Sequence, residues 1–210
     1  MKTLLEAMRW RAALKKFIPE PLKKDQMDLL LEAVRLAPSS FGLQPVKVVV
    51  ITNPEMLLKL RTAGYNQAQI SEASALFVFA IETGLDDVFV DRFITSISET
   101  RGVSLETLAD YSNMMKGSLS SRTSEQRIAW ATNQAYLSLG VLITGAAVEG
   151  IDVGPMEGFD PAQFDEILGL TEKGLTAKVI AAVGFRDAAD PYLAMKKVRF
   201  PIDEVIIRVE

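Results

Sequence analysis

Three stretches of apolar residues along the chain have the length and composition of buried strands. Val46–Thr52 is a β-branched run, Ala75–Ile81 is apolar and aromatic, and Ala177–Phe185 alternates loosely between apolar and polar residues. Short runs of this kind are typical of strands that are covered on their faces. The sequence predicts a fourth strand over Val205–Val209, at the C-terminal end.

Helical patterns fill the intervals between these strands. Asp25 precedes a 3–4 spaced apolar stripe that Pro38 ends, and Asn53 is a cap before a proline at the first helical position. Two further helices are predicted, one with Phe89, Phe93 and Ile97 on one face and a stop at Gly102, and a long one from the capping box Thr123-Gln126 through Gly150. The long helix is rich in small residues, so we expect it to be covered on most sides. Because helices and strands do not alternate regularly, the order favours an α+β fold.

Length and charge narrow the class of protein. The chain has 210 residues, 49% of them hydrophobic, which predicts a single domain over 1–210. Its net charge is −4 and it has no basic block, so we expect no nucleic-acid partner. The longest apolar runs fall far short of the ~18–20 residues that cross a bilayer, and Met1–Trp10 has no secretory pattern. We therefore expect a cytoplasmic protein that does not bind membranes.

The residue types that are missing exclude most familiar catalytic sites. With 0 Cys and 0 His, the chain can form no Ser–His–Asp triad, no thiolate nucleophile and no Cys- or His-based zinc site, and we expect no metal. It also lacks the GxGxxG fingerprint and the P-loop. Redox chemistry remains open to such a chain, because a bound cofactor can carry the reactive atoms.

Four segments are candidates for binding a cofactor, and each also has a purely structural interpretation. They are a cationic helix at Arg11–Phe17, a polar loop at Ala37–Pro45, the segment Gly154–Pro161 and the basic segment Lys196–Pro201. The structural interpretations are a solvated helix face, ordinary turn chemistry, the capping of a helix by Asp160, and the protection of an edge strand.

Together and in this order, the segments resemble the FMN-dependent nitroreductases of the oxygen-insensitive bacterial type. The resemblance rests on Pro38-Ser39-Ser40 with Gln44-Pro45, on Pro155–Asp160 and on Lys197-Val198-Arg199, and it extends from Arg11 to Arg199. It implies a nitroreductase-like α+β fold with a mainly antiparallel central sheet flanked by helices. It also implies a homodimer that binds FMN at its interface and exchanges a C-terminal strand.

The resemblance also implies which residues contact FMN. Arg11, Lys197 and Arg199 correspond to the phosphate contacts, Lys15 to the cation near flavin N1 and O2, and Asn66 to the amide at the pyrimidine edge. The backbone amides of Glu157 and Gly158 should face N5 and O4. The full implied set of cofactor contacts is Arg11, Lys15, Pro38, Ser39, Ser40, Gly42, Asn66, Gln69, Pro155, Met156, Glu157, Gly158, Lys197 and Arg199.

The implied activity needs no catalytic side chain. Hydride passes from NADH or NADPH to flavin N5 and then to a nitroaromatic or quinone-type acceptor in a ping-pong cycle, while the protein supplies orientation and electrostatics. The expected substrate contacts are Ser40, Phe41, Met115 and Lys116.

The chain departs from the family pattern at three cofactor positions. Ala12 and Ala13 replace a polar pair, and Gln69 replaces a lysine. We therefore expect weaker FMN retention and a lower flavin potential than in a relative with those groups. These departures leave open a non-enzymatic dimeric binding protein that has lost FMN. A second alternative is a relative that reduces one specific metabolite or fragments flavin, since such relatives differ in the pocket segments from Phe89 to Thr123.

Overall fold

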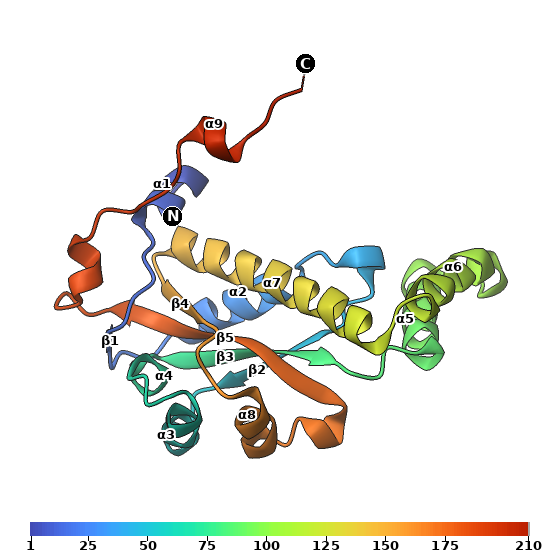
Figure 1. The fold of residues 1–210 in the computed structure, drawn as a ribbon, viewed down its shortest axis with the longest axis horizontal. Helices are drawn as coiled ribbons and strands as arrows, with labels where there is room; N and C mark the ends of the chain where they lie inside the picture. The colour runs from blue at the N-terminus through green and yellow to red at the C-terminus, as the bar shows by residue number, and fades with distance from the viewer. Residues whose placement is uncertain (210) are drawn as a thin grey trace.

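The computed structural model describes residues 1–209, which form an antiparallel sheet between two layers of helices (Figure 1). The five strands have the order β1–β5–β3–β2, and β4 also pairs with β5. Every pairing among them is antiparallel, which confirms the predicted class. The strands are β1 (Phe17–Ile18), β2 (Val46–Ile51), β3 (Ala75–Glu82), β4 (Asp152–Met156) and β5 (Leu175–Arg186). The helices are α1 (Leu4–Trp10), α2 (Lys24–Arg35), α3 (Pro54–Ala63), α4 (Gln69–Glu72), α5 (Asp87–Arg101), α6 (Ala109–Ser120), α7 (Ser124–Glu149), α8 (Pro161–Leu168) and α9 (Ile202–Val205).

The central strand β3 is apolar throughout because both of its faces are covered. Phe77 and Phe79 pack in the core beneath α7, whereas Leu76 and Val78 pack in the core beneath α3 and α8. This division follows from the two-residue period of a strand, in which successive side chains point to opposite faces. Figure 1 shows α2 and α7 over one face of the sheet and α3 and α8 over the other.

Helix α7 has the bounds that its end signals predict. Thr123 accepts a hydrogen bond from the Gln126 N–H, and the Gln126 side chain accepts one from the Thr123 N–H. At the other end Gly150 takes the left-handed conformation, with φ 78°, which favours glycine. The small residues Ala131, Ala135 and Ala146 are buried, so the helix lies close to the sheet. No helix within residues 1–209 has both the length and the apolar character needed to cross a membrane.

Three sequence-based predictions of local structure are wrong. Arg11–Phe17 is not a helix, because α1 ends at Trp10 and the chain continues extended into β1. Strand β4 was not predicted, because Gly and Pro at its centre are unfavourable in a strand; an edge strand that pairs only with β5 tolerates them. The strand predicted over Val205–Val209 does not form within this chain: α9 ends at Val205, and the residues after it up to 209 lie in no strand.

A nearly buried ion pair fixes the end of the sheet. Asp152 is 1% exposed and accepts two hydrogen bonds from the Arg186 guanidinium, at 2.9 and 2.7 Å. The same guanidinium lies 3.8 Å from the ring centroid of Trp10, the last residue of α1. The pair therefore joins β4, β5 and α1.

Replacing Arg186 with methionine should destabilise the fold. The substitution leaves the Asp152 carboxylate buried without its ionic partner, which costs on the order of 3 kcal/mol in the free energy of unfolding. Urea denaturation of the wild type and Arg186→Met measures this loss, and the double variant with Asp152→Asn should recover part of it. A loss below about 1 kcal/mol, the range of exposed pairs, would contradict this account of the pair.

Candidate functional site

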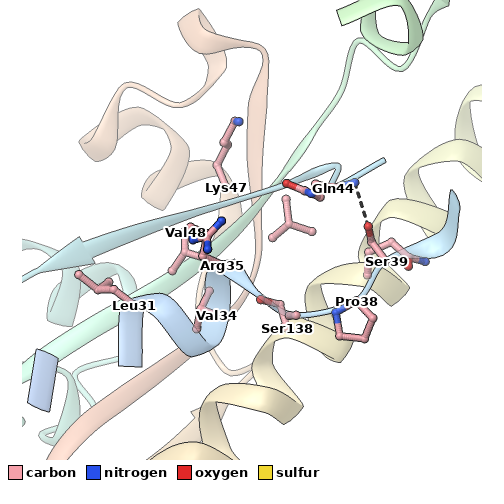
Figure 2. Close-up of a pocket in the computed structure, with 12 residues that line it drawn as sticks. Leu31, Val34, Arg35, Pro38, Ser39, Gln44, Lys47, Val48 and Ser138 are labelled. Carbon is pink, nitrogen blue, oxygen red and sulfur yellow. Dashed lines mark hydrogen bonds between the residues drawn. The ribbon is translucent and has the colours of Figure 1, made fainter. Parts of the chain in front are cut away.

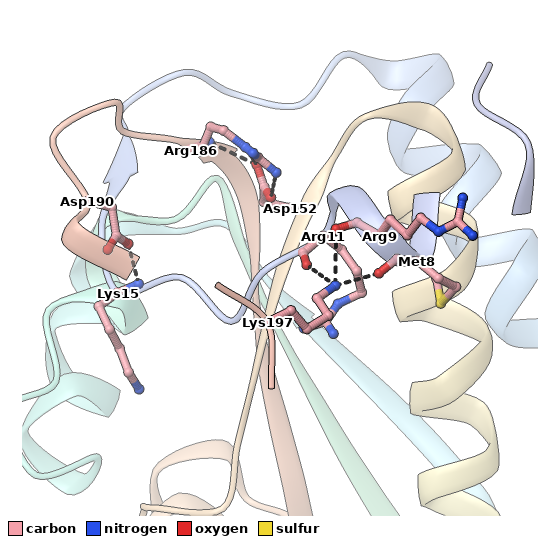
Figure 3. Close-up of polar contacts among 8 residues, drawn as sticks. All are labelled: Met8, Arg9, Arg11, Lys15, Asp152, Arg186, Asp190 and Lys197. Carbon is pink, nitrogen blue, oxygen red and sulfur yellow. Dashed lines mark hydrogen bonds and ion pairs between the residues drawn. The ribbon is translucent and has the colours of Figure 1, made fainter. Parts of the chain in front are cut away.

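Three cations gather where α1 ends. The ammonium of Lys197 donates hydrogen bonds to the backbone carbonyls of Met8, Arg9 (3.3 Å) and Arg11 (2.7 Å), as Figure 3 shows. These carbonyls are at the C-terminus of the helix, where a cation is favourable. Lys197 comes from a segment that follows the sheet, so this contact holds the C-terminal segment against α1.

Within residues 1–209, no carboxylate forms an ion pair with Arg11, Lys197 or Arg199. Burial, followed by the charge of Arg199, lowers the pKa of Arg11, and only Asp152 opposes this shift. Burial and the charges of the two arginines lower the pKa of Lys197 in the same direction. Asp152 already forms its ion pair with Arg186. Among the described residues, the buried Arg11 Nε has no hydrogen-bond partner. This cluster therefore has the charge and the unsatisfied donor of a site for a dianionic phosphate.

A cavity of about 750 Å³ lies beside the start of β1 and includes both Lys15 and Gln69. Asp190 accepts hydrogen bonds from the backbone N–H groups of Lys15 (2.7 Å) and Lys16 (2.9 Å), which fixes the path of this segment. Gln69 is 3% exposed and donates to the Gln67 side chain at 3.2 Å. The fold thus brings together two of the predicted ring contacts that lie 54 residues apart in the sequence.

The turn after β4 borders a second cavity, of about 490 Å³. Pro155, Met156 and Glu157 line it together with Tyr136 and Gly140 of α7. Within residues 1–209 the backbone N–H groups of Glu157 and Gly158 donate no hydrogen bond, whereas those of Phe159 and Asp160 bond to Glu157 and to Ala63, each at 2.9 Å. Two adjacent backbone donors are thus left for an electron-rich edge of a ligand.

The loop Pro38–Gly42 lies in a different part of the molecule. Ser39 accepts a hydrogen bond from the Gln44 N–H at 2.9 Å (Figure 2), and the Gln134 side chain of α7 accepts one from the Ser40 N–H at 2.8 Å. The N-terminal segment meets α7 at Val148, whose carbonyl accepts from the Lys2 N–H. Gln134 and Val148 are 14 residues apart on one helix, which is about 20 Å at the helical rise of 1.5 Å per residue. Figure 1 shows α1, at whose end the cations gather, beside the C-terminal end of α7, so in one copy of the chain the cation cluster and this loop lie toward different ends of the helix.

Comparisons with known proteins decide the family. The model of the nitroreductase family matches residues 8–185. The chain is 30% identical over 214 residues, with 98% of this chain and 96% of the relative aligned, to a Staphylococcus haemolyticus protein with a provisional NAD(P)H nitroreductase name. The chain belongs to the nitroreductase family. An oxygen-insensitive NAD(P)H nitroreductase of Salmonella typhimurium is 26% identical over 95% of this chain and 96% of the relative.

A solved structure supports the fold. A chain from Exiguobacterium sibiricum, solved in complex with FMN, has a TM-score of 0.83, 20% sequence identity and coverage of 100% of this chain and 98% of that one. As a nitroreductase-family member, this protein is an NAD(P)H-dependent oxidoreductase with FMN as its cofactor. The alternative of a non-enzymatic binding protein is thereby set aside. The unsatisfied Arg11 Nε and the cationic cluster around it fit the phosphate of FMN.

The remaining predicted residues lie in several places. Asn66 is exposed at the end of α3 with φ 57°, and its carbonyl accepts from Arg61 Nε at 3.3 Å. The Phe41 carbonyl accepts a hydrogen bond from the Tyr111 hydroxyl of α6 at 2.9 Å. Met115 is fully buried in the core, and Lys116 pairs with Asp91 at 2.6 Å. The substrate contacts expected of Met115 and Lys116 stay predictions.

Four residues of the site region were missed by sequence reasoning. Gln134 and Tyr111 hold the Ser39–Gly42 loop from α7 and α6, while Gln67 and Tyr136 hold the turn after β4. A partial signal was available: Gln134 and Ser138 are two polar residues one turn apart on a face of α7 whose other buried residues are apolar. The tyrosines and Gln67 carry no such signal, because their partners are distant in the sequence.

Removing the Lys197 ammonium should weaken FMN binding. The variant Lys197→Met loses one charge-assisted hydrogen bond, and at a partly exposed site we expect the dissociation constant to rise about tenfold, or ~1.4 kcal/mol. Titration of the apoprotein, followed by the quenching of FMN fluorescence, measures the change. Lys196→Met is the matched control, because it removes the neighbouring charge from a side chain that forms none of the hydrogen bonds to α1 that Lys197 forms. An equal effect of both variants would indicate that only overall charge matters.

Proposed function

We propose that this nitroreductase-family protein reduces nitroaromatic or quinone-type acceptors with NAD(P)H by a ping-pong mechanism, as a cytoplasmic homodimer. The observation that carries the proposal is the cluster of Arg11, Lys197 and Arg199 with its unsatisfied buried donor. Such a cluster destabilises the folded chain unless an anion neutralises it. The phosphate of FMN, the cofactor that membership of the family implies, is such an anion.

Different residues of the chain would bind the phosphate of FMN and orient its ring. Arg11, Lys197 and Arg199 bind the phosphate, and Lys15 lies in the cavity that also includes Gln69, where the pyrimidine end of the ring would be held. The N–H groups of Glu157 and Gly158 are left to bind the ring edge. When bound, FMN supplies hydride-transfer chemistry between NAD(P)H and the acceptor.

The protein contributes no strong acid or base to the cavity beside the turn. Within residues 1–209, the ionisable residues that line it are Tyr136 and Glu157. Burial, with the hydrogen bond to Glu157 next, raises the pKa of Tyr136 to about 12, so its hydroxyl remains protonated at neutral pH. A lining that is otherwise apolar favours flat, weakly polar acceptors over charged ones.

A second copy of the chain would complete the site. The Pro38–Gly42 loop and the cation cluster lie too far apart in one copy to hold the same ligand, and a two-fold dimer would bring the loop of one copy to the cluster of the other.

The C-terminal segment also exposes many apolar side chains, as a surface that packs against a second copy would. Each of the following is at least half exposed: Val198, Phe200, Ile202, Val205, Ile206, Ile207 and Val209. Figure 1 shows this segment leaving the body of the molecule beside α1.

Steady-state kinetics tests the reaction type. Initial rates with varied NADH at several fixed concentrations of a quinone or a nitroaromatic compound should give parallel lines in a double-reciprocal plot. Parallel lines are expected because the donor leaves before the acceptor binds to the same surface. Intersecting lines would show that both substrates are bound together, which contradicts the proposal.

Truncation tests the dimer. A chain that ends at Pro201 keeps Lys197 and Arg199 but loses the exposed apolar residues after them, so we expect its dimer to dissociate at least about tenfold more readily. Analytical ultracentrifugation over a range of protein concentrations measures the change. A full-length variant in which Ile206 and Ile207 are replaced by serine should shift in the same direction. The dimer proposal fails if the wild-type chain sediments as a monomer throughout.

A further inference from the structure

The turn after β4 is held from two opposite directions. On one side the Gln67 amide donates to the carbonyls of Gly158 (2.5 Å) and Gly64 (3.1 Å), which joins the turn to the end of α3. On the other side the Glu157 carboxylate accepts a hydrogen bond from the Tyr136 hydroxyl of α7. The two contacts tie one short turn to helices on opposite faces of the sheet.

The Tyr136 hydroxyl is a stable donor in this contact. Tyr136 is 39% exposed, and its ring lines the same cavity as the apolar residues Leu139, Ile143 and Met156. Burial and the neighbouring carboxylate raise the pKa of Tyr136 to about 12, so the phenol keeps its proton across the physiological range. The hydroxyl and the carboxylate thus form a polar pair at the edge of a mostly apolar surface.

The hydrogen bond between Tyr136 and Glu157 restrains the backbone of the turn, because the same residue, Glu157, carries both the bonded carboxylate and one of the two unused backbone N–H groups. The directions of the Glu157 and Gly158 N–H bonds are set by the conformation of two peptide units, and no hydrogen bond of their own holds them within residues 1–209. A side-chain anchor at Glu157 reduces the freedom of these peptide units. Donors that are fixed before a ligand binds cost less to order on binding.

We propose that Tyr136 is a positioning residue that holds the Glu157-Gly158 turn so that its two backbone donors face the cofactor ring. The inference deepens the proposed function, since it rests on the placement of the ring edge against these amides. Tyr136 acts through Glu157 and is not assigned a proton-transfer step.

Hydrogen exchange of the apoprotein tests the positioning role without FMN. In Tyr136→Phe the hydroxyl is lost and the ring is kept, so the Phe159 and Asp160 amides, which bond within and beside the turn, should exchange about tenfold faster. Amides in the middle of β3 should be unchanged. Tyr192→Phe, which removes the hydroxyl of an exposed tyrosine, is the matched control and should alter neither set.

FMN titration of the same variants tests the functional consequence. Tyr136→Phe and Glu157→Ala should each raise the dissociation constant about 3- to 10-fold, and the double variant should be no weaker than Glu157→Ala alone, because the tyrosine acts through the carboxylate. Glu157→Gln keeps an acceptor oxygen for the phenol and should bind FMN nearly as well as the wild type. A purely structural role of Tyr136 predicts additive losses and no rescue by glutamine.

The outcomes separate this inference from the proposed function. Unchanged exchange and unchanged FMN affinity in Tyr136→Phe would overturn the inference while the wild type still binds FMN and oxidises NADH. If the wild type bound no FMN, the proposed function and the cofactor part of the inference would both fail. In that case the exchange experiment would still decide whether Tyr136 fixes the turn.

Discussion

The repulsion among three cations at the end of α1 is the constraint on which the arrangement of the site depends. Burial and the charge of Arg199 lower the pKa of Arg11, and burial and the charges of both arginines lower the pKa of Lys197. Asp152, the carboxylate that opposes the shift at Arg11, is paired with Arg186. Carbonyls at the C-terminus of α1 compensate the Lys197 ammonium only in part. The folded chain therefore stores an unfavourable interaction at a position that an anion can relieve, which is how a binding site differs from a structural ion pair.

Helix α7 contacts the segment that leads to this cluster as well as the other segments of the site. Its C-terminal end receives the segment that leads to Arg11, its middle positions Tyr136 beside the turn after β4, and Gln134 holds the Ser39–Gly42 loop. One straight helix thus places three binding elements at fixed intervals along its axis. Gln134 and Tyr136 are two residues apart, whereas Val148 lies 14 residues beyond Gln134, about 20 Å along the helix. This long interval is the reason for proposing that a second copy completes the site.

The sequence predicts the parts of this fold that depend on local rules. The apolar run of β3 and the bounds of α7 follow from burial on both faces and from the cap residues Thr123 and Gly150. Strand β4 could not be predicted, since its pairing with β5 outweighs the poor strand propensity of Gly154 and Pro155. The residues from 206 to 209 pair with no strand of this chain, so their β-branched composition gives no strand here.

Local sequence patterns predict less of the binding site than of the fold. Arg11 and Lys197 were identified through the family resemblance, because a contact across 186 residues leaves no periodic signal.

The comparison of FMN with riboflavin, which lacks the phosphate, tests most directly the claim that the cation cluster binds the phosphate of FMN. Fluorescence titration of the apoprotein should show riboflavin binding at least about 100-fold more weakly than FMN, the value of one to two charge-assisted hydrogen bonds. Equal affinities would contradict the assignment of the cation cluster to the phosphate.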